Sequence, residues 1–267
     1  MVGTVHGVGC VMTCITMQEA EANRNRVVGI SNLLPKIEWA KLMIKYALGH
    51  SSNPVINFSG GKDSLVVLDL VRRIRPTTIG VFANTGIEYK ETVPYALSFD
   101  NIVELHPDKS FWQCEGEYGL PVMKSKAKRH GNMCCLWLKE KPLVKYYKEN
   151  NVDLSFTGLT ADESRQRKLT LMRMGPYYWH KSDLTYKCHP IYDWTSQDVW
   201  DYINFFKLPY NPIYDMGIAR CGCRFCTAYL NWKKTTELYN PLDTQILARK
   251  QGYALISDFE DKTELYA

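Results

Sequence analysis

The stretch best suited to chemistry is the hexapeptide Ser59-Gly60-Gly61-Lys62-Asp63-Ser64. The apolar run 55–58 before it has strand character, and the apolar run 65–71 after it has the character of a buried helix. A strand that turns through two glycines into a helix brings backbone N–H groups and the positive end of the helix dipole close to an anion. Lys62 adds a full charge, and Ser59 and Ser64 add hydroxyl donors. The stretch therefore predicts a phosphate cradle, against the alternative of a plain Gly-Gly turn with a solvated lysine.

The cradle does not match the two commonest nucleotide-binding patterns. The Gly-x-x-x-x-Gly-Lys spacing of a Walker A loop is missing, and so is the Gly-x-Gly-x-x-Gly pattern of a dinucleotide fingerprint. The hexapeptide therefore indicates a different kind of phosphate-binding loop.

Cysteines form the second chemical signal, as the adjacent pair Cys134-Cys135 and the spaced pair Cys223 and Cys226. Four thiolates can hold a tetrahedral zinc ion or an iron–sulfur cluster. Adjacent cysteines suit separate iron corners of a cluster better than one zinc ion, but zinc stays open at this point. The simplest alternative is that the adjacent pair only packs and the downstream pair alone binds a metal.

The other cysteines are harder to assign. Cys221 could supply a further ligand, or it could lie near the metal site as a free thiol able to carry sulfur as a persulfide. Cys10 and Cys14 would share one face of a helix and are candidate extra ligands, although packing is the simpler role. Cys114 and Cys188 have no assigned role.

The composition favours one large α/β domain, with or without a small appendage. The chain has 267 residues, 45% of them hydrophobic and 12% aromatic, which argues against global disorder. A formal net charge of +5 suits a protein that binds nucleotides or nucleic acid, and also many that bind neither. No apolar run is long enough to cross a membrane, and the N-terminus lacks the pattern of a signal peptide. Nine cysteines beside a nucleotide loop indicate a reducing, cytoplasmic setting.

Strands and helices alternate along the middle of the chain. Strands are predicted at 55–58, 77–82, 101–106, 154–157 and 184–188, and helices at 37–48, 65–71, 88–97, 140–150 and 199–206. The first of these helices is expected to pack before the first strand, and its apolar residues stand at helical spacing: Ile37, Trp39, Ala40, Leu42, Met43, Tyr46 and Ala47. The residues Thr195 to Asp198 form a capping box before the last helix. The alternation predicts a doubly wound, mostly parallel sheet with helices on both faces.

Such a sheet binds its ligand at the carboxyl ends of the strands. Asn84-Thr85-Gly86 follows the second predicted strand, and the segment that begins at Gly158 follows the fourth, so both should meet the phosphate cradle. The basic run 124–129 lies just before the adjacent cysteines and could contact a nucleic-acid backbone, although such a run is usually a solvated face.

Taken together, these motifs resemble the phosphoadenosine phosphosulfate reductase family of the PP-loop ATP pyrophosphatase superfamily, over about Asn53 to Tyr229. The resemblance is carried by the hexapeptide, by Cys134-Cys135 with Lys139, by the stretch from Gly158 through Glu163-Ser164 to Arg167, and by 190–200 leading to Cys223 and Cys226. It implies a Rossmann-like fold of the adenine nucleotide alpha hydrolase type. It also implies three parts: a helical segment at 1–50, the PP-loop domain at 51–230 and a tail at 231–267.

The resemblance implies a 4Fe–4S cluster on Cys134, Cys135, Cys223 and Cys226, in the cluster-bearing branch of the family. Two features of the sequence bear on the reaction. The reductases of the family attack sulfate sulfur with a cysteine near the C-terminus, whereas no cysteine follows Cys226 here. Those reductases also tend to carry an altered loop, whereas this loop is intact. Both features favour ATP cleavage over reduction of an activated sulfate.

The resemblance also suggests roles for individual residues. Ser59, Gly60, Gly61, Lys62 and Ser64 would hold the β and γ phosphates of ATP, and Asp63 would position Mg²⁺ or the loop. Arg165 and Arg167 would reach the α-phosphate or the acceptor, unless they are a solvated helix start, and Glu163 would orient them or bind the metal. The family often has an arginine where Thr160 stands.

The expected function is that of an ATP pyrophosphatase that adenylates a substrate for sulfur incorporation, similar to the enzymes of DNA phosphorothioation. The partners implied are an adenine nucleotide, DNA or transfer RNA as acceptor, a cysteine desulfurase as sulfur donor, and a second copy of the chain. The alternatives are a phosphoadenosine or adenosine phosphosulfate reductase, a transfer RNA thiolation enzyme, and a nucleotide-binding assembly subunit with a structural cluster.

Overall fold

The computed structural model describes residues 17–122, 132–229 and 231–250, with side chains from residue 31 onward. Several positions singled out in the sequence lie outside these ranges: Cys10, Cys14, the basic run 124–129 and the end of the tail. Within the described ranges, no helix is long and apolar enough to cross a membrane.

The described residues form a six-stranded sheet in the order β3-β2-β1-β4-β6-β5. The strands are β1 (Pro54–Asn57), β2 (Ile79–Ala83), β3 (Ile102–Leu105), β4 (Leu154–Thr157), β5 (Tyr177–His180) and β6 (Thr185–Cys188). The first four and β6 are mutually parallel, which confirms the predicted mostly parallel α/β sheet. The edge strand β5 runs antiparallel to β6 and was not predicted, because its aromatic residues carry no clear alternation of polar and apolar positions.

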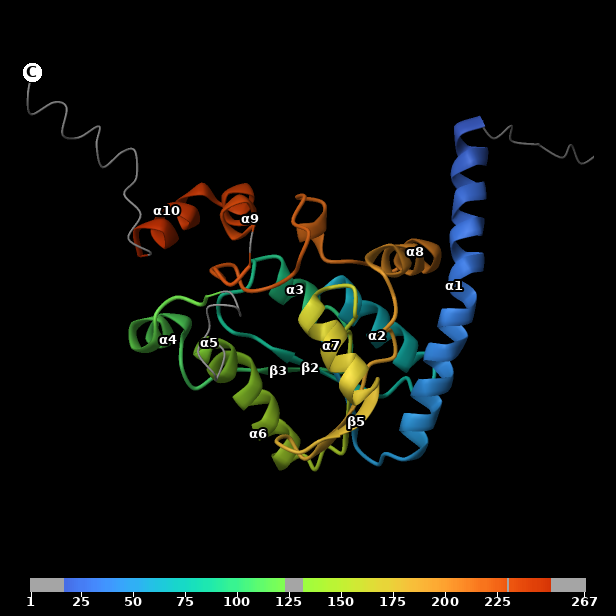
Figure 1. The fold of residues 1–267 in the computed structure, drawn as a ribbon, viewed down its shortest axis with the longest axis horizontal. Coiled ribbons are helices and arrows are strands. Elements are labelled where there is room, and N and C mark those ends of the chain that lie inside the picture. The colour runs from blue at the N-terminus through green and yellow to red at the C-terminus, as the bar shows by residue number, and fades with distance from the viewer. Residues whose placement is uncertain (1–16, 123–131, 230, 251–267) are drawn as a thin grey trace, which may run out of the picture.

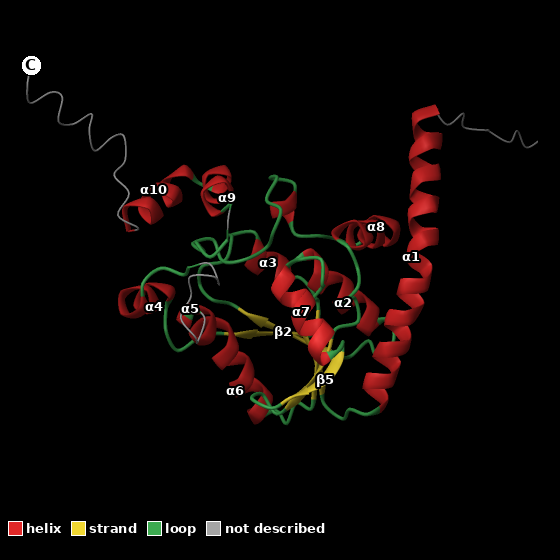
Figure 2. Cartoon of the chain, in the orientation of Figure 1, coloured by secondary structure: helices red, strands yellow, loops and turns green. Residues whose placement is uncertain are grey.

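Helices cover both faces of the sheet (Figures 1 and 2). One face packs against α1 (Met17–Gly49), α2 (Lys62–Arg72), α3 (Thr92–Leu97) and α8 (Ser196–Phe206), and the other face packs against α6 (Lys141–Glu149). The remaining helical elements are α4 (Phe111–Tyr118), α5 (Met133–Cys135), the π-helical turn η1 (Leu136–Glu140), α7 (Arg165–Met174), η2 (Pro212–Tyr214), α9 (Trp232–Tyr239) and α10 (Pro241–Lys250).

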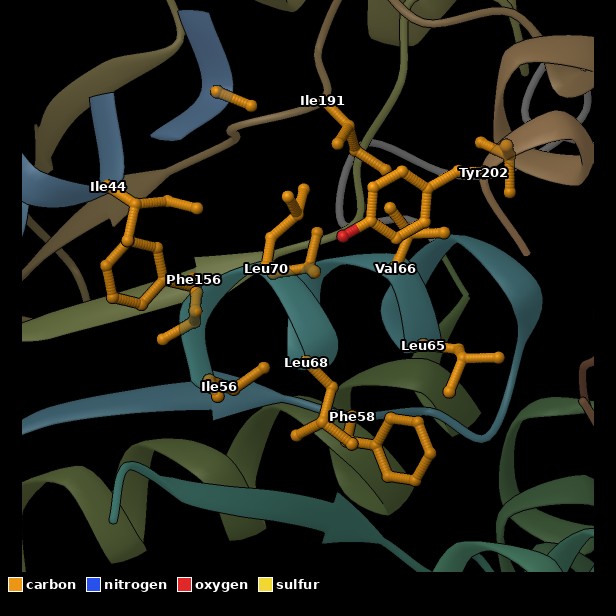
Figure 3. Close-up of a cluster of buried hydrophobic side chains, with 14 of the residues drawn as sticks. Ile44, Ile56, Phe58, Leu65, Val66, Leu68, Leu70, Phe156, Ile191 and Tyr202 are labelled. Carbon is orange, nitrogen blue, oxygen red and sulfur yellow. The ribbon is translucent and has the colours of Figure 1, made fainter. Parts of the chain in front are cut away.

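Strand alternation decides which side chain enters which core. On β1, Ile56 points toward α2 and is fully buried, whereas the neighbouring Val55 packs with Tyr147 of α6 on the opposite face. Helix α2 is buried along almost its whole apolar surface, because the sheet lies on one side of it and α1 and α8 lie on the other (Figure 3). This packing fixes the helix whose first turn follows the glycine loop.

One expectation about the helices needs correction. The stretch 88–97 is helical only from Thr92, because 88–91 forms a bridge and turn and Pro94 is accommodated in the first helical turn. The predicted helix at 37–48 is confirmed as part of α1, where Ile37, Ala40 and Ala47 are buried and Met43 packs partly buried against the core. The rest of that apolar set does not pack against the core. Trp39, Leu42 and Tyr46 are 50%, 59% and 58% exposed, because a helix can turn only one face to the core. The capping box at Thr195 and Asp198 is confirmed.

The central position of β1 allows a direct stability test. We expect Ile56→Ala to lower the free energy of unfolding by about 3 kcal/mol, because it removes a fully buried side chain and leaves a cavity. The control Ile79→Ala on the neighbouring strand should cost about 1 kcal/mol or less, because Ile79 is 39% exposed. Urea unfolding of both variants measures the difference, and equal losses would contradict this view of the core.

Candidate functional site

The glycine loop connects β1 to α2 with a backbone that a larger residue would strain. Gly60 has a φ of +73°, and a Cβ there would lie 3.0 Å from the Thr92 side chain. Gly61 is the N-cap of α2 and has no side chain that could cap the first turn. A Cβ on Gly61 would lie 3.2 Å from Cβ of Cys221. The loop therefore presents the start of α2 to a neighbouring cavity with little side-chain bulk around it.

The two serines of the loop brace it from inside. The Ser64 hydroxyl donates to the carbonyl oxygen of Gly61 at 2.8 Å and accepts from the backbone N–H of Ser59 at 3.2 Å. The hydroxyl oxygens of Ser59 and Ser64 lie 3.1 Å apart. Ser64 thus holds the shape of the loop in addition to any contact it makes with a ligand.

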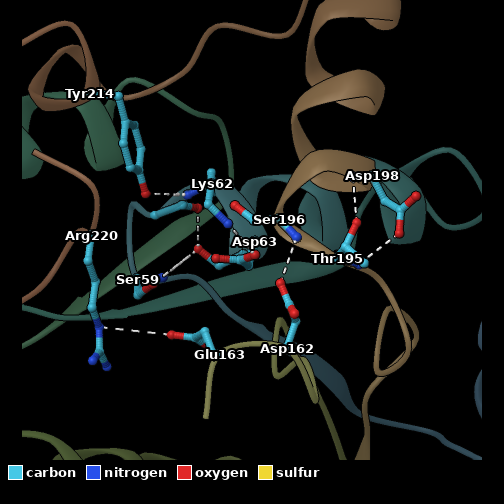
Figure 4. Close-up of polar contacts among 12 residues, drawn as sticks. Ser59, Lys62, Asp63, Asp162, Glu163, Thr195, Ser196, Asp198, Tyr214 and Arg220 are labelled. Carbon is cyan, nitrogen blue, oxygen red and sulfur yellow. Dashed lines mark hydrogen bonds and ion pairs between the residues drawn. The ribbon is translucent and has the colours of Figure 1, made fainter. Parts of the chain in front are cut away.

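Lys62 and Asp63 lie side by side at the start of α2. Nζ of Lys62 is 2.9 Å from Oδ1 of Asp63, and the Lys62 residue is 8% exposed. The backbone N–H of Lys62 donates to the Tyr214 hydroxyl at 2.9 Å, so η2 is tied directly to the loop (Figure 4). Burial raises the pKa of the Tyr214 hydroxyl, which therefore stays a neutral hydrogen-bonding group at neutral pH.

Gly158, after β4, makes the closest backbone contact of the site. A Cβ at this position would lie 2.6 Å from the carbonyl carbon of Asp63 and 2.7 Å from the backbone nitrogen of Ser64. Only glycine allows the end of β4 to approach the first turn of α2 this closely. The contact joins the two strand ends that flank the cavity.

A cavity of about 550 Å³ opens beside the loop. Its walls come from the loop, from the end of β4 and the segment after it, from η1 and α7, from the first residue of α8, and from η2 with the segment after it. Eight of the residues proposed for nucleotide binding or catalysis line it: Ser59, Gly61, Lys62, Asp63, Ser64, Gly158, Glu163 and Arg167. The fold therefore brings most of the predicted residues to one place.

The two arginines proposed from the sequence have different positions. Arg167 lines the cavity and forms an ion pair with Glu163, whose other carboxylate oxygen is 3.9 Å from Nε of Arg220 (Figure 4 labels Glu163 and Arg220). Burial, and then the nearby Arg220, lower the pKa of Arg167. Arg165 is exposed and does not line the cavity. Arg220, which the sequence pattern did not single out, takes the place expected for a second cation.

The turn after β2 lies beside the cavity rather than in its wall. Asn84 donates to Glu104 at 2.6 Å, and the Thr85 hydroxyl donates to Glu88 at 2.6 Å. Glu88 also forms an isolated backbone bridge with Cys223. The turn that contains Asn84, Thr85 and Gly86 therefore anchors the cysteine segment, while Phe82 and Ala83 line a smaller cavity of about 130 Å³ next to the loop.

All four cysteines predicted to bind a cluster line one further cavity. Cys134, Cys135, Cys223 and Cys226 surround a space of about 20 Å³, whose other walls are Ile87, Phe111, Pro121, Leu138 and Lys139. The first pair lies at α5, followed by the π-turn η1, and π-turns are frequent at functional sites. Within the described residues, no three His, Cys, Asp or Glu side chains form a site for a single metal ion.

Lys139 and Cys221 lie between the cavity of the four cysteines (the cysteine cavity) and the cavity of about 550 Å³ beside the glycine loop (the nucleotide cavity). Lys139 lines both, and the charge of a Cys223 thiolate is the main cause that raises the pKa of Lys139. Cys221 lines the nucleotide cavity, with its sulfur 3.6 Å from the carbonyl oxygen of Ser59. Burial raises the pKa of the Cys221 thiol to about 11. The two sites are therefore neighbours with shared walls.

His189 supports the cavity from behind and was not singled out from the sequence. Its Nδ1 lies 2.6 Å from the hydroxyl of Thr157, a residue of the cavity wall, and its Nε2 has no hydrogen-bond partner among the described residues. Burial lowers the pKa of His189, so the ring is neutral at neutral pH.

The fold and the glycine loop together are those of a PP-loop protein. The phosphoadenosine phosphosulfate reductase domain matches residues 53–229, about two thirds of the chain. The chain belongs to the phosphoadenosine phosphosulfate reductase family. This confirms the resemblance inferred from the motifs.

Individual relatives are consistent with this placement. An adenosine 5'-phosphosulfate reductase of Bacillus cytotoxicus is 30% identical over 202 residues, which cover 73% of this chain and 79% of the relative. An uncharacterized protein of Methanocaldococcus jannaschii is 32% identical over 74% of this chain, but the chain spans only 48% of that relative. The crystal structure of a phosphoadenylyl-sulfate reductase from Candida auris, a phosphate complex, has a TM-score of 0.53 at 17% identity. It covers 79% of this chain and 97% of its own, and shows the shared fold.

The contact at Gly158 predicts a large effect from one methyl group. Gly158→Ala should push the end of β4 away from the first turn of α2 and weaken ATP binding about tenfold or more, because a Cβ cannot occupy that space. The matched control is Gly116→Ala in α4, where nothing lies within 4 Å of the added Cβ. Calorimetric titration with ATP measures both, and unchanged affinity in Gly158→Ala would contradict the proposed geometry.

Buried His189 predicts a pH-dependent loss of stability. Burial, with Lys187 and Arg167 nearby, lowers the pKa of His189 from 6.5 to about 4. As the pH falls below 6.5, the unfolded chain binds a proton that the folded chain does not, so stability present above that pH is lost. Between pH 7.5 and 5, this costs about 2 kcal/mol. The decline should be smaller by that amount in His189→Gln, as followed by urea unfolding, and parallel declines would refute the assignment.

Proposed function

We propose that this chain is an ATP pyrophosphatase that transfers AMP to an acceptor and so prepares it for sulfur incorporation. The observation that carries the proposal is the intact loop, with the buried Lys62 and a glycine N-cap at the start of α2, beside a cavity of about 550 Å³. A lysine and free N–H groups at this point suit the pyrophosphate of ATP, which leaves when the α-phosphate is attacked.

The cavity offers separate groups for each part of ATP. The loop and Lys62 would bind the β and γ phosphates, and the Asp63 carboxylate would bind Mg²⁺, which prefers oxygen ligands. Arg167 and Arg220, held by Glu163, would neutralise charge at the α-phosphate. The adjoining cavity at Phe82 has apolar walls suited to the adenine base.

The first step can be written with its bonds balanced. An acceptor oxygen attacks the α-phosphorus, the bond to the bridging oxygen breaks, and pyrophosphate leaves with that electron pair. The acceptor then carries AMP. A thiol reductant first releases hydrosulfide from the persulfide of the sulfur donor. The hydrosulfide attacks the activated centre and AMP departs with the former acceptor oxygen, so one oxygen is replaced by sulfur.

We also propose that the four cysteines hold a 4Fe–4S cluster. Their donor set fits, because four thiols from two segments surround one cavity that lies next to Lys139 and the nucleotide cavity. The thiols must rotate outward to admit the cluster, since the space between them is only about 20 Å³. A bound cluster would supply a metal centre that can hold sulfur, while Lys139 would balance the negative charge of its ligands.

The acceptor we favour is a DNA backbone phosphate, with a cysteine desulfurase as sulfur donor in the cytoplasm. This choice rests on the combination of an intact loop with a set of cluster-type cysteines. Transfer RNA is the alternative acceptor, because the same adenylation would make a base carbonyl oxygen a leaving group.

A second candidate is a phosphoadenosine or adenosine phosphosulfate reductase. The relatives named as adenosine 5'-phosphosulfate reductases favour it, and so does the Cys221 thiol in the wall of the nucleotide cavity. The Cys221 thiolate would attack the sulfate sulfur and release AMP from adenosine phosphosulfate, or adenosine bisphosphate from phosphoadenosine phosphosulfate. A dithiol reductant would then release sulfite from the thiosulfonate. The raised pKa of Cys221, about 11, makes this thiol a weak nucleophile at neutral pH.

Pyrophosphate release is the decisive measurement. Under anaerobic conditions, the chain with ATP and Mg²⁺ should release pyrophosphate, and DNA should stimulate the release if DNA is the acceptor. Lys62→Ala should lower the rate at least about a hundredfold, because it removes the charge that binds the leaving group. The matched control is Lys90→Ala, whose side chain is 82% exposed and lies outside the cavity.

The opposite result would identify the second candidate. Sulfite formed from a sulfonucleotide and a dithiol, with no pyrophosphate from ATP, would overturn the proposal. Loss of that sulfite in Cys221→Ser, with nucleotide binding retained, would identify Cys221 as the nucleophile.

The cluster has a test that does not depend on activity. Cys226→Ser should lower iron and acid-labile sulfide well below the content of the wild-type protein, because it removes one of four proposed ligands. Cys188→Ala, which changes a buried cysteine of β6 outside the cysteine cavity, should leave both unchanged. Equal iron content in the wild-type protein, Cys226→Ser and Cys188→Ala would exclude the proposed set of four cysteine ligands.

A further inference from the structure

Helix α7 concentrates positive charge beside the nucleotide cavity. It contains Arg165, Arg167, Lys168 and Arg173 and no acidic residue, so its formal charge is +4, whereas the whole chain has +5. Arg167 forms its ion pair with Glu163 at the cavity wall. Arg165, Lys168 and Arg173 are exposed and form no ion pair among the described residues. Like charges spaced this closely repel one another, so a bound anion would stabilise the helix.

Helical spacing places the exposed cations around a short apolar row. Leu169 and Met172 are three residues apart on the same side of α7 and are 50% and 75% exposed. Lys168 lies on one flank of this row and Arg173 lies on the other. Within α7 only Leu171 is buried, and no other helix lies over α7 in Figure 1. This outer surface, called the α7 face, consists of Arg165, Lys168, Leu169, Met172 and Arg173.

The α7 face leads to the nucleotide cavity. Arg165 is in the first turn of α7, and Glu163, two residues before it, lines the cavity. The Glu163 carboxylate lies 3.9 Å from Nε of Arg220, whose side chain is 61% exposed. The carboxylate of Asp162 accepts from the backbone N–H of Ser196 at 3.1 Å, so it faces α8 (Figure 4). Cations therefore continue from the α7 face to the cavity wall.

The spacing of these cations suits a phosphodiester strand. Arg165 and Arg173 are separated by about 12 Å along the helix axis. One strand of a duplex carries a phosphate every 3.4 Å or so along its axis, so this span covers about three phosphates. Lysine and arginine bind phosphate oxygens, and exposed Leu169 and Met172 suit contact with sugars and bases. Continuity with the cavity in which the acceptor phosphate would be activated favours a nucleic acid over an acidic protein.

We propose that the α7 face binds the phosphodiester backbone of a nucleic acid and leads it into the nucleotide cavity as the acceptor. Lys168 and Arg173 contact phosphates on either side of the apolar row, and Arg165 and Arg220 continue the contact toward the cavity. The inference rests on the proposed function, because it assigns the surface that recognises the acceptor. The binding test below needs no ATP, so it can fail independently of AMP transfer.

The salt dependence of binding to a labelled DNA duplex tests the phosphate contacts. The double variant Lys168→Gln with Arg173→Gln should weaken binding at least about tenfold at low salt and reduce the slope of log affinity against log salt by about 2, because two phosphate contacts are lost. The control double variant Lys45→Gln with Lys234→Gln removes the same charge from exposed positions of α1 and α9, and its slope should match the wild type. Equal slopes in the wild type and the α7 variant would overturn the proposal and favour an acidic protein as partner.

The apolar row has a separate test in Met172→Ser. This variant should bind the duplex about fivefold more weakly, because apolar contact area is lost, while the salt slope stays the same, because no charge is removed. The control Leu242→Ser changes a 63% exposed leucine of α10 and should leave the affinity unchanged. Unchanged affinity in Met172→Ser would refute the contact between this row and the strand.

Two further readouts identify the source of the strand and separate this inference from the proposed function. Labelled transfer RNA is titrated in parallel with the DNA duplex, and the acceptor is the one whose affinity falls more in the Lys168→Gln with Arg173→Gln variant. Equal affinity of the wild type and this variant for both nucleic acids would overturn the proposal. Binding through the α7 face without pyrophosphate release would support the docking surface and contradict AMP transfer, whereas pyrophosphate release with unchanged slopes would do the reverse.

Discussion

The close approach of β4 to the first turn of α2 is the constraint on which the site depends. Gly158 lies so near the backbone of Asp63 and Ser64 that no side chain fits between them. Packing of its apolar side chains against the sheet, α1 and α8 fixes the position of α2. The hydroxyls of Ser59 and Ser64 stabilise the loop through contacts within it. The shape of the glycine loop is therefore set by packing, and the charge of Lys62 is added to a loop whose shape is already fixed.

The cysteine segment is tied to the same framework. Cys223 pairs through its backbone with Glu88, the backbone N–H of Arg224 donates to Ile87 at 2.8 Å, and the Arg224 side chain pairs with the buried Asp243 of α10. These contacts place the four thiols beside the nucleotide cavity, with Lys139 between the two sites. A change of charge at one site can therefore affect the other site through the Lys139 side chain, which lines both.

Family membership narrows the chemistry without choosing the reaction. Relatives of this chain include proteins named as sulfonucleotide reductases, and the fold is shared with a phosphoadenylyl-sulfate reductase. The choice between AMP transfer and sulfate reduction depends on side chains: an intact loop with Lys62 on one hand, and a half-buried, weakly acidic Cys221 on the other. Because the same fold can host different reactions, the reaction of this chain must be inferred from these residues.

The sequence by itself determined the phosphate loop, the mostly parallel sheet and the family, because these depend on local motifs and on the alternation of strands and helices. Tertiary structure decided the rest. It turned Arg167 inward and left Arg165 outside, gave Arg220 a place at the cavity, and set His189 behind Thr157. It also covered one stripe of α1 and left Trp39, Leu42 and Tyr46 exposed. Helical spacing shows that residues share a face, but only long-range packing decides which face is covered and which side chains converge on one cavity.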